Sequence, residues 1–271
     1  MTGPAPLVDI GINLAHASFD ADRAAVLERA AAAGVVHLIV TGSSLASSRT
    51  ARDYALAAPQ RLSATAGVHP HHAREFAAAE LPLLRELLTS SKVVAVGECG
   101  LDYFRDLSPR VDQERAFRAQ IELAIEAGKP LFLHQRAAHG ELVRILRDYG
   151  SALPPAVAHC FTGTLAEAEE CLALGLWIGI TGWICDERRG LHLREVVRAV
   201  PAGRLMLETD GPYLLPRTLR PKPATRRNEP MYLAEVCAAV AAARGEPAPV
   251  TACTTSRTAA GFFGFALPGD A

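Results

Sequence analysis

Short apolar runs alternate with longer segments of helical periodicity along the whole amino-acid sequence. The runs are nearly continuous in Val, Ile, Leu and Ala, which is typical of parallel strands that are buried on both faces of a sheet. Eight such runs, each followed by a helical segment, predict the α/β class and a (β/α)8 or TIM barrel. The predicted strands cover residues 7–13, 35–41, 62–68, 93–98, 130–134, 156–160, 177–181 and 205–209.

The predicted helices end in glycine, the residue that most readily closes a helix in the left-handed conformation. Gly34, Gly128 and Gly175 each follow an Ala-rich helical segment. A length of 271 residues matches the usual size of one barrel of this kind. We therefore expect a single domain over residues 1–271, with the proline-rich segment 211–230 as a loop beside the active site rather than a linker.

The composition argues against several classes of protein. A formal net charge of -1 gives the whole molecule no general attraction to nucleic acid, so a basic surface would have to be local. The six cysteines include no CxxC pair, which argues against a zinc–thiolate site and a disulfide framework. No signal-peptide pattern is present, and the longest apolar stretch, residues 172–185, is too short to span a bilayer. We expect a soluble, cytoplasmic protein that binds no membrane.

Four of the predicted strands end in a side chain that can bind a metal ion. These side chains are Glu98, His134, His159 and Asp210. Any one of them alone would be interpreted as a buried polar residue with a hydrogen-bond partner. Because parallel strands bring their carboxyl ends to one edge of a sheet, the four are expected to converge. One carboxylate with two imidazoles is a common site for a divalent ion, and Asp210 would be a further ligand or a base that takes a proton from water.

Two basic segments and one histidine are candidates for binding a polyanionic substrate at the same edge. One segment is CDERRG, and the other is residues 217–227, which contain no acidic residue. Guanidinium groups match the geometry of phosphate, although a solvated loop is the alternative for both segments, and a turn residue is the alternative for the histidine. The candidates for phosphate binding are His69, Arg188, Arg189, Arg226 and Arg227.

Several motifs together resemble the TatD family of metal-dependent deoxyribonucleases. They are AGVHPH, VGECGLD, HCFTG, GITGWICDERRG, ETDGPYLLPR and RRNEP, spread over nearly the whole chain. The resemblance implies a TIM barrel of the metal-dependent hydrolase superfamily and hydrolysis of phosphodiester bonds with a divalent ion. For the founding member of the family it implies 3′-to-5′ exonuclease action on single-stranded DNA and RNA, with a suggested part in the repair of oxidative DNA damage.

The resemblance also assigns residues to the metal site. The family's metal-binding positions fall on Glu98, His134, His159 and Asp210. Most members begin with D-x-H-x-H, whose histidines hold one of two ions, whereas Gly11 and Asn13 stand at those positions here. Glycine offers no ligand and an amide is a weak one, so we expect one strong metal site and a doubtful second site at Asp210, with Asn13 as a further donor. The founding member shares this departure.

We therefore predict a metal-dependent exonuclease that acts on single-stranded DNA and RNA as a monomer. Glu98, His134 and His159 would hold the ion, and Glu98 and Asp210 would carry catalysis. Mg²⁺ is the expected ion, ahead of Mn²⁺ or Zn²⁺. Two alternatives stay open, an amidohydrolase or lactonase of a small molecule on the same fold, and a non-catalytic relative that binds nucleic acid or a protein.

Overall fold

A computed structural model describes residues 5–269 of the chain. Its eight strands form one sheet in the order β1-β2-β3-β4-β5-β6-β7-β8, and the pairs β3–β4, β4–β5, β5–β6 and β7–β8 are parallel. This order is the topology of the (β/α)8 fold, so the predicted fold class is confirmed. The strands are β1 (Leu7–Ile12), β2 (Val35–Val40), β3 (Leu62–Ala66), β4 (Val93–Asp102), β5 (Leu131–Arg136), β6 (Ala156–Ala158), β7 (Trp177–Ile180) and β8 (Leu205–Leu207).

Helices follow the strands in the predicted alternation. Helix α4 ends at Gly128, whose φ of 62° is the left-handed conformation that glycine adopts without strain. The helices are α1 (Arg23–Ala32), α2 (Leu45–Ala57), α3 (Leu81–Leu88), α4 (Arg110–Ala127), α5 (His139–Tyr149), α6 (Leu165–Ala173), α7 (Leu193–Ala199), α8 (Leu233–Arg244) and α9 (Ala248–Phe263). Among the described residues, no helix is both long enough and apolar enough to cross a membrane.

The contacts within the chain fall into two compact units. The central unit comprises residues 40–159 and 173–176, and the terminal unit comprises residues up to 39, residues 160–172 and residues from 177 onward. The expectation of a single domain over residues 1–271 stays a prediction.

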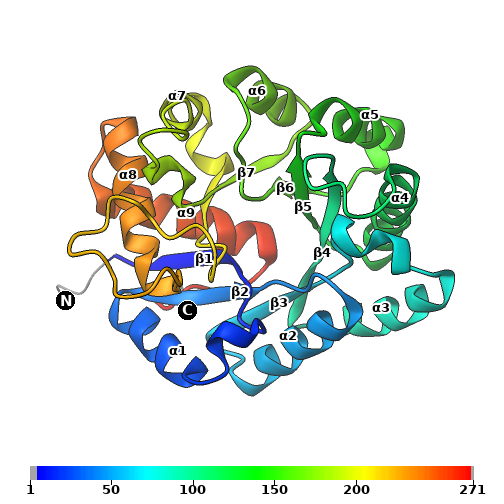
Figure 1. Cartoon of the computed structure of the whole chain (residues 1–271), viewed down its shortest axis with the longest axis horizontal. Helices are drawn as coiled ribbons and strands as arrows, with labels where there is room; N and C mark the ends of the chain where they lie inside the picture. The colour runs from blue at the N-terminus through cyan, green and yellow to red at the C-terminus, as the bar shows by residue number, and fades with distance from the viewer. Residues whose placement is uncertain (1–4, 270–271) are drawn as a thin grey trace. The chain divides into compact units, whose positions relative to one another are not determined.

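In the central unit, β3, β4, β5 and β6 are parallel neighbours, and α2, α3 and α4 pack beside β3 and β4 (Figure 1). Phe117 and Ile121 of α4 are fully buried against this sheet. The buried side chain of Gln120 accepts a hydrogen bond from the backbone of Val68 and donates one to the carbonyl of the same residue. Helix α4 therefore holds the backbone just beyond β3, where the chain leads into His69.

Strand β4 continues to Asp102, four residues beyond the end that the sequence predicted. Two glycines let its backbone pass very close to β5, since a Cβ on Gly97 would lie 2.2 Å from the carbonyl oxygen of Phe132. A Cβ on Gly100 would lie 2.0 Å from that of His134. The register of the β4–β5 pair shifts between Val96 and Cys99. This bulge surrounds Glu98 and sets the direction of its side chain.

In the terminal unit, β7 pairs with β8 in parallel, and α9 packs on β1 and β8. Just after these strands, Ile12 forms an isolated parallel bridge with Gly211. The segment after β8 runs without an α-helix until α8 begins at Leu233, as the proline-rich sequence predicted.

Candidate metal centre and the basic loops

Three imidazole nitrogens converge on one carboxylate oxygen in the central unit. Oε1 of Glu98 lies 2.9 Å from Nδ1 of His134, 2.9 Å from Nε2 of His159 and 3.3 Å from Nε2 of His69. Glu98, His159 and His69 are buried, and His134 is half-buried. The structure thus brings together the predicted trio of Glu98, His134 and His159, and it adds His69.

The cluster keeps its carboxylate charged despite its burial. Burial alone would raise the pKa of Glu98, but the histidines His69, His159 and His134 outweigh it and hold the pKa well below its usual range. Burial likewise acts to lower the pKa of His134, but the neighbouring carboxylates of Asp102 and Glu98 raise it above its usual value. A buried anion surrounded by imidazoles is a strong attractor for a cation.

Asp102 is a member of this cluster that sequence reasoning missed. Its Oδ2 lies 2.8 Å from Nε2 of His71 and 3.4 Å from Nε2 of His134, and its Oδ1 accepts hydrogen bonds from the backbone of Phe104 and Arg105. Burial would raise the pKa of Asp102, but these partners hold it below its usual range. The sequence did contain a signal for Asp102, because it closes the same apolar run as Glu98. It stands four residues beyond Glu98, and residues an even number apart in a strand face the same side of the sheet.

The proton of the His69 ring can be assigned to one of its two nitrogens. Nδ1 of His69 accepts the backbone N–H of His71, and burial lowers the pKa of His69 to about 4. The neutral ring therefore carries its proton on Nε2, the atom that faces Glu98. By distance alone His69, Glu98 and His134 could share an ion. The hydrogen bond at Nδ1, however, makes Nε2 a donor rather than a ligand, in agreement with the predicted contact to a phosphate.

Glu98, His134 and His159 offer the types of donor atom that a divalent ion binds, although among the described residues the group whose ligand atoms all lie within 4.8 Å of one another contains His69 in place of His159. Nε2 of His134 is buried and makes no hydrogen bond, because its 3.4 Å approach to Asp102 does not have hydrogen-bond geometry. A ligating histidine normally turns its second ring nitrogen towards a carboxylate, and Asp102 stands at that place for His134. Mn²⁺ and Zn²⁺ readily bind a set of one carboxylate and two imidazoles. Mg²⁺ prefers oxygen ligands and would bind mainly through the carboxylate.

Asp210 belongs to the terminal unit, at the end of β8. It adopts a φ of 52°, and its backbone N–H donates to the carbonyl of Gly11 over 2.8 Å. Nδ2 of Asn13 donates to Oδ1 of Asp210 over 2.9 Å. The structure therefore pairs the two residues that the sequence assigned to a doubtful second metal site, and a metal-binding role for them stays a prediction.

Two further carboxylates of the terminal unit are buried. Glu208 stands two residues before Asp210, and Asp9 contacts Thr209, the residue before Asp210. Glu208 is fully buried and accepts the backbone N–H of Cys160. Asp9, also fully buried, accepts hydrogen bonds from the backbone and the hydroxyl of Thr209, and its burial raises the pKa of Asp9 to about 7. Neither was among the site residues that the sequence predicted.

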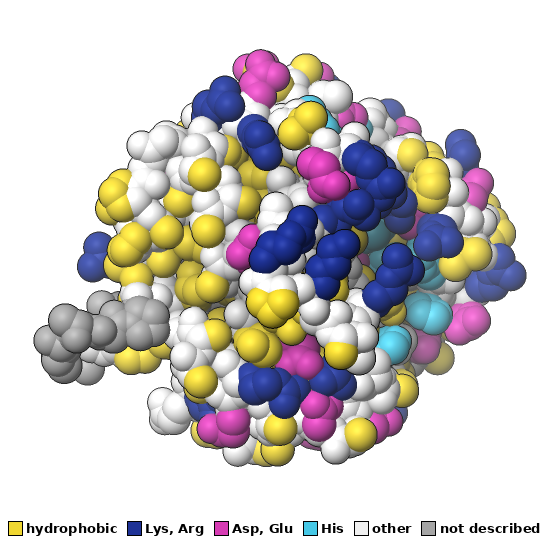
Figure 2. Space-filling view, turned by 60° about the vertical axis from the view of Figure 1, so that its left-hand side comes forward, with side chains coloured by type: hydrophobic (Ala, Val, Ile, Leu, Met, Phe, Trp, Pro, Cys, Tyr) yellow, Lys and Arg dark blue, Asp and Glu magenta, His cyan; other side chains and the backbone are white. Residues whose placement is uncertain are grey.

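All four predicted phosphate-binding arginines lie in the terminal unit. Within the described residues 5–269, two of them are paired with acidic residues and two are not. The guanidinium of Arg227 is bound by Asp22 and Glu229, and that of Arg189 is bound by Asp186. Among the described residues, the side chains of Arg188 and Arg226 have no hydrogen-bond or ion-pair partner. Lys and Arg side chains gather on one face in the space-filling view (Figure 2).

Comparisons with known proteins agree with the motifs. The family described as TatD related DNase matches residues 8–264. A 3′-5′ ssDNA/RNA exonuclease TatD of Erwinia billingiae is 50% identical over 240 residues, which are 89% of this chain and 92% of that protein. The protein of the same name from Escherichia fergusonii is 48% identical over 261 residues, 96% of this chain and 100% of its own length.

Solved structures show the same fold. The crystal structure of YJJV, a TatD homolog from Escherichia coli K12, superposes with a TM-score of 0.87 at 31% identity and covers 96% of this chain and 98% of that one. A phosphotriesterase homology protein from Escherichia coli has a TM-score of 0.57 at 16% identity, over 77% of this chain and 83% of that one. The second likeness concerns the fold alone.

Proposed function

The chain belongs to the TatD family of DNases, and on that basis we propose that it is a metal-dependent exonuclease. It would remove nucleotides from the 3′ end of single-stranded DNA and RNA, as the names of its relatives state for those proteins. The observation that carries the proposal is the convergence of His134 and His159 on the buried carboxylate of Glu98. A small-molecule amidohydrolase would not need the unpaired arginines of the basic loops.

Each residue of the cluster has a distinct part in the proposal. Glu98, His134 and His159 would hold a divalent ion, with Mg²⁺ the proposed ion in the cell. An ion at this place supplies positive charge to a phosphoryl oxygen and lowers the pKa of water. Asp102 would orient His134. His69 would donate the proton of Nε2 as a hydrogen bond to a phosphate oxygen, because its low pKa keeps the ring neutral.

The remaining roles in the proposal fall on residues of the terminal unit. Asp210, restrained by Asn13, keeps the proposed role of accepting a proton from the attacking water. Arg188 and Arg226 would bind phosphates of the strand, and Arg189 could join them only by exchanging its ion pair with Asp186. Arg227 is left out because two carboxylates already bind it. A part in repair of oxidative DNA damage, the monomeric state and the cytoplasmic location stay predictions.

The test is a nuclease assay on purified protein with a 5′-labelled single-stranded oligonucleotide and Mg²⁺ or Mn²⁺. We expect a ladder of products that shorten from the 3′ end, no products in EDTA, and at least about a hundredfold lower rate for His159→Ala. His72→Ala is the matched control, since His72 is exposed three residues beyond His69. Full metal-dependent activity of His159→Ala would overturn the proposal.

A further inference from the structure

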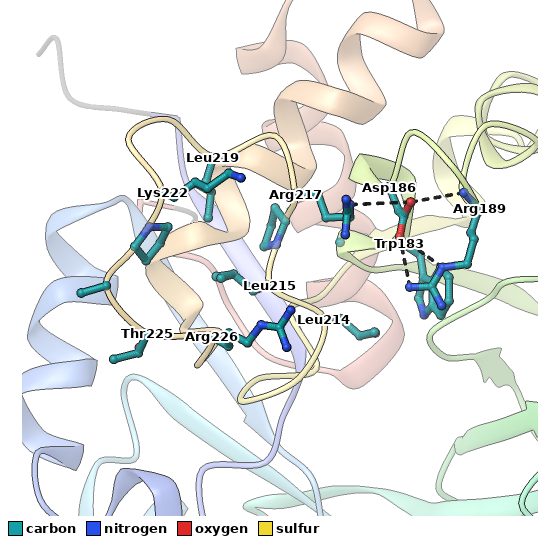
Figure 3. Close-up of a pocket in the computed structure, with 14 residues that line it drawn as sticks. Trp183, Asp186, Arg189, Leu214, Leu215, Arg217, Leu219, Lys222, Thr225 and Arg226 are labelled. Atoms are coloured by element: carbon teal, nitrogen blue, oxygen red, sulfur yellow. Dashed lines mark hydrogen bonds and ion pairs between the residues drawn. The ribbon is translucent and has the colours of Figure 1, made fainter.

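A pocket of about 480 Å³ lies in the terminal unit between the turn after β7 and the loop after β8 (Figure 3). The turn is the 3₁₀ helix Gly182–Cys185 with the residues up to Arg189, and the loop contributes residues 214–226. No role for this pocket follows from the metal cluster, whose residues all belong to the central unit. Its volume falls within the range of about 300–1,000 Å³ that is usual for sites of small ligands.

The two walls of the pocket are held in place by close backbone approaches. A Cβ on Gly182 would lie 2.3 Å from the carbonyl oxygen of Leu214, and a Cβ on Gly190 would lie 1.9 Å from that of Trp183. Leu214 itself adopts a φ of 57°, a conformation that is strained for a residue with a side chain. A side chain on Gly182 would collide with the Leu214 carbonyl, so a glycine is required where the turn meets the loop.

The polar lining of the pocket is strongly basic. Four cations, Arg189, Arg217, Lys222 and Arg226, face one acid, Asp186, which leaves a formal charge of +3. Asp186 is shared by Arg189 at 3.1 Å and by Arg217 at 3.8 Å (Figure 3). Among the described residues, the side chains of Lys222 and Arg226 have no partner, and both are exposed. These two cations can bind an anion without first losing an ion pair.

The rest of the lining is apolar. Leu214, Leu215 and Leu219 are half-buried around the pocket, and Trp183 presents a ring whose centroid lies 4.5 Å from the guanidinium carbon of Arg189. Inorganic phosphate would leave this apolar surface unused. A duplex keeps its bases stacked inside, so that a base cannot enter. An unpaired nucleotide has both a phosphate and an apolar face, and it uses both halves of the lining.

We propose that this pocket binds one nucleotide of a single strand, with its base against Leu214, Leu215 and Trp183 and its phosphate on Lys222 and Arg226. The assignment of this nucleotide to a substrate rests on the proposed nuclease function, but nucleotide binding itself does not. The pocket thereby favours single strands over duplexes, because only an unpaired base reaches its apolar wall.

The experiment uses the only two tryptophans of the sequence. Trp177→Phe leaves Trp183 as the single fluorophore, within the pocket. This protein is titrated in EDTA, where no turnover is expected, with a short oligothymidylate and with an abasic strand of the same length and charge. We expect the thymidylate to quench Trp183 and to bind at least about tenfold more tightly than the abasic strand, from the stacking of about one base.

The double variant Lys222→Gln/Arg226→Gln tests the phosphate contact in the same background. Its affinity for the thymidylate is expected to fall about tenfold or more, and its log–log salt slope to shrink by about 0.7 for one lost phosphate contact. Arg49→Gln/Arg257→Gln is the control of equal charge, since both arginines are exposed and neither has a partner among the described residues. Circular dichroism checks that each variant is folded.

Equal affinity of the Trp177→Phe protein for the thymidylate and abasic strands would overturn the proposal, because a surface that binds any polyanion does not distinguish strands by their bases. This outcome does not depend on the charge variants. An unchanged affinity of the folded double variant would overturn it as well. Hydrolysis of bis(4-nitrophenyl) phosphate separates the two proposals. Metal-dependent hydrolysis with no quenching contradicts the pocket alone, whereas base-dependent quenching with no hydrolysis upholds the pocket and contradicts the nuclease.

Discussion

Asn13 donates a hydrogen bond from Nδ2 to Oδ1 of Asp210 over 2.9 Å. The acceptor stands in the left-handed region with a φ of 52°, and a second bond, from its own backbone N–H to the carbonyl of Gly11, holds it there. The side chain at position 13 thus restrains a carboxylate. Asn13 is accordingly a positioning residue for the proposed base.

We expect Asn13→Ala to lower kcat roughly ten- to a hundredfold, since one hydrogen bond to a charged group contributes about 1.5–3 kcal/mol. KM for an oligonucleotide and the affinity of the Glu98 cluster for Mn²⁺ should stay within about twofold, because neither involves Asn13. Steady-state kinetics and calorimetric metal titration measure the three quantities. A wild-type kcat in Asn13→Ala would contradict the positioning role.

The proton on His69 leads to a second expectation. His69→Ala should bind Mn²⁺ with nearly wild-type affinity, since Nε2 is a donor rather than a ligand, while its kcat falls about a hundredfold through loss of a hydrogen bond to the phosphate. His159→Ala should lose metal affinity at least about tenfold, and serves as the comparison in the same titration. If the two variants lose equal metal affinity, His69 is a ligand and our tautomer assignment is wrong.

The positions of the strands were predictable because each is an uninterrupted apolar run between helical segments. The added length of β4 was not, since it depends on how closely Gly97 and Gly100 let the backbone approach β5, a tertiary contact that leaves no apolar pattern. The two glycines look like ordinary turn residues in the sequence.

The residues of the metal cluster were predictable only where a strand ended on them. Glu98, His134 and His159 met that condition. Asp102 was missed because the predicted strand stopped at Glu98, whereas β4 continues to Asp102. Its contacts with two histidines on other segments are tertiary. The pairing of Arg227 with Asp22, 205 positions away in the sequence, was equally invisible, so a charge-run pattern counted that arginine as available for phosphate.

Replacement of Gly97 by alanine tests the β4 bulge. We expect Gly97→Ala to lower the free energy of unfolding by at least about 2 kcal/mol and to weaken metal binding, since the new methyl group meets the Phe132 carbonyl at 2.2 Å and φ is 140°. Gly140→Ala in α5 is the control, because nothing lies within 4 Å of its Cβ, and helix propensity should raise stability by up to about 1 kcal/mol. Urea denaturation measures the free energy of unfolding of both variants. If Gly97→Ala is as stable as the wild type, the backbone of β4 shifts to accommodate the new methyl group.

The buried carboxyl group of Asp9 makes stability depend on pH in a direction opposite to that of a paired acid. Burial raises its pKa from 3.8 to about 7, so the folded protein binds this proton more tightly than the unfolded chain does. The stabilisation is complete below about pH 4 and is lost as the pH rises through about 7.

We therefore expect the free energy of unfolding to fall between pH 5 and pH 8, with a contribution from Asp9 of up to about 1.4 kcal/mol per pH unit. Asp9→Asn keeps one oxygen acceptor for Thr209 but cannot titrate, so the difference between wild type and variant isolates this carboxyl group from all others. Urea denaturation at pH 5, 6, 7 and 8 measures that difference. A difference that stays constant over this range would mean that Asp9 is already ionised in the fold, with its three hydrogen bonds from Thr209 and Gly11 outweighing its burial.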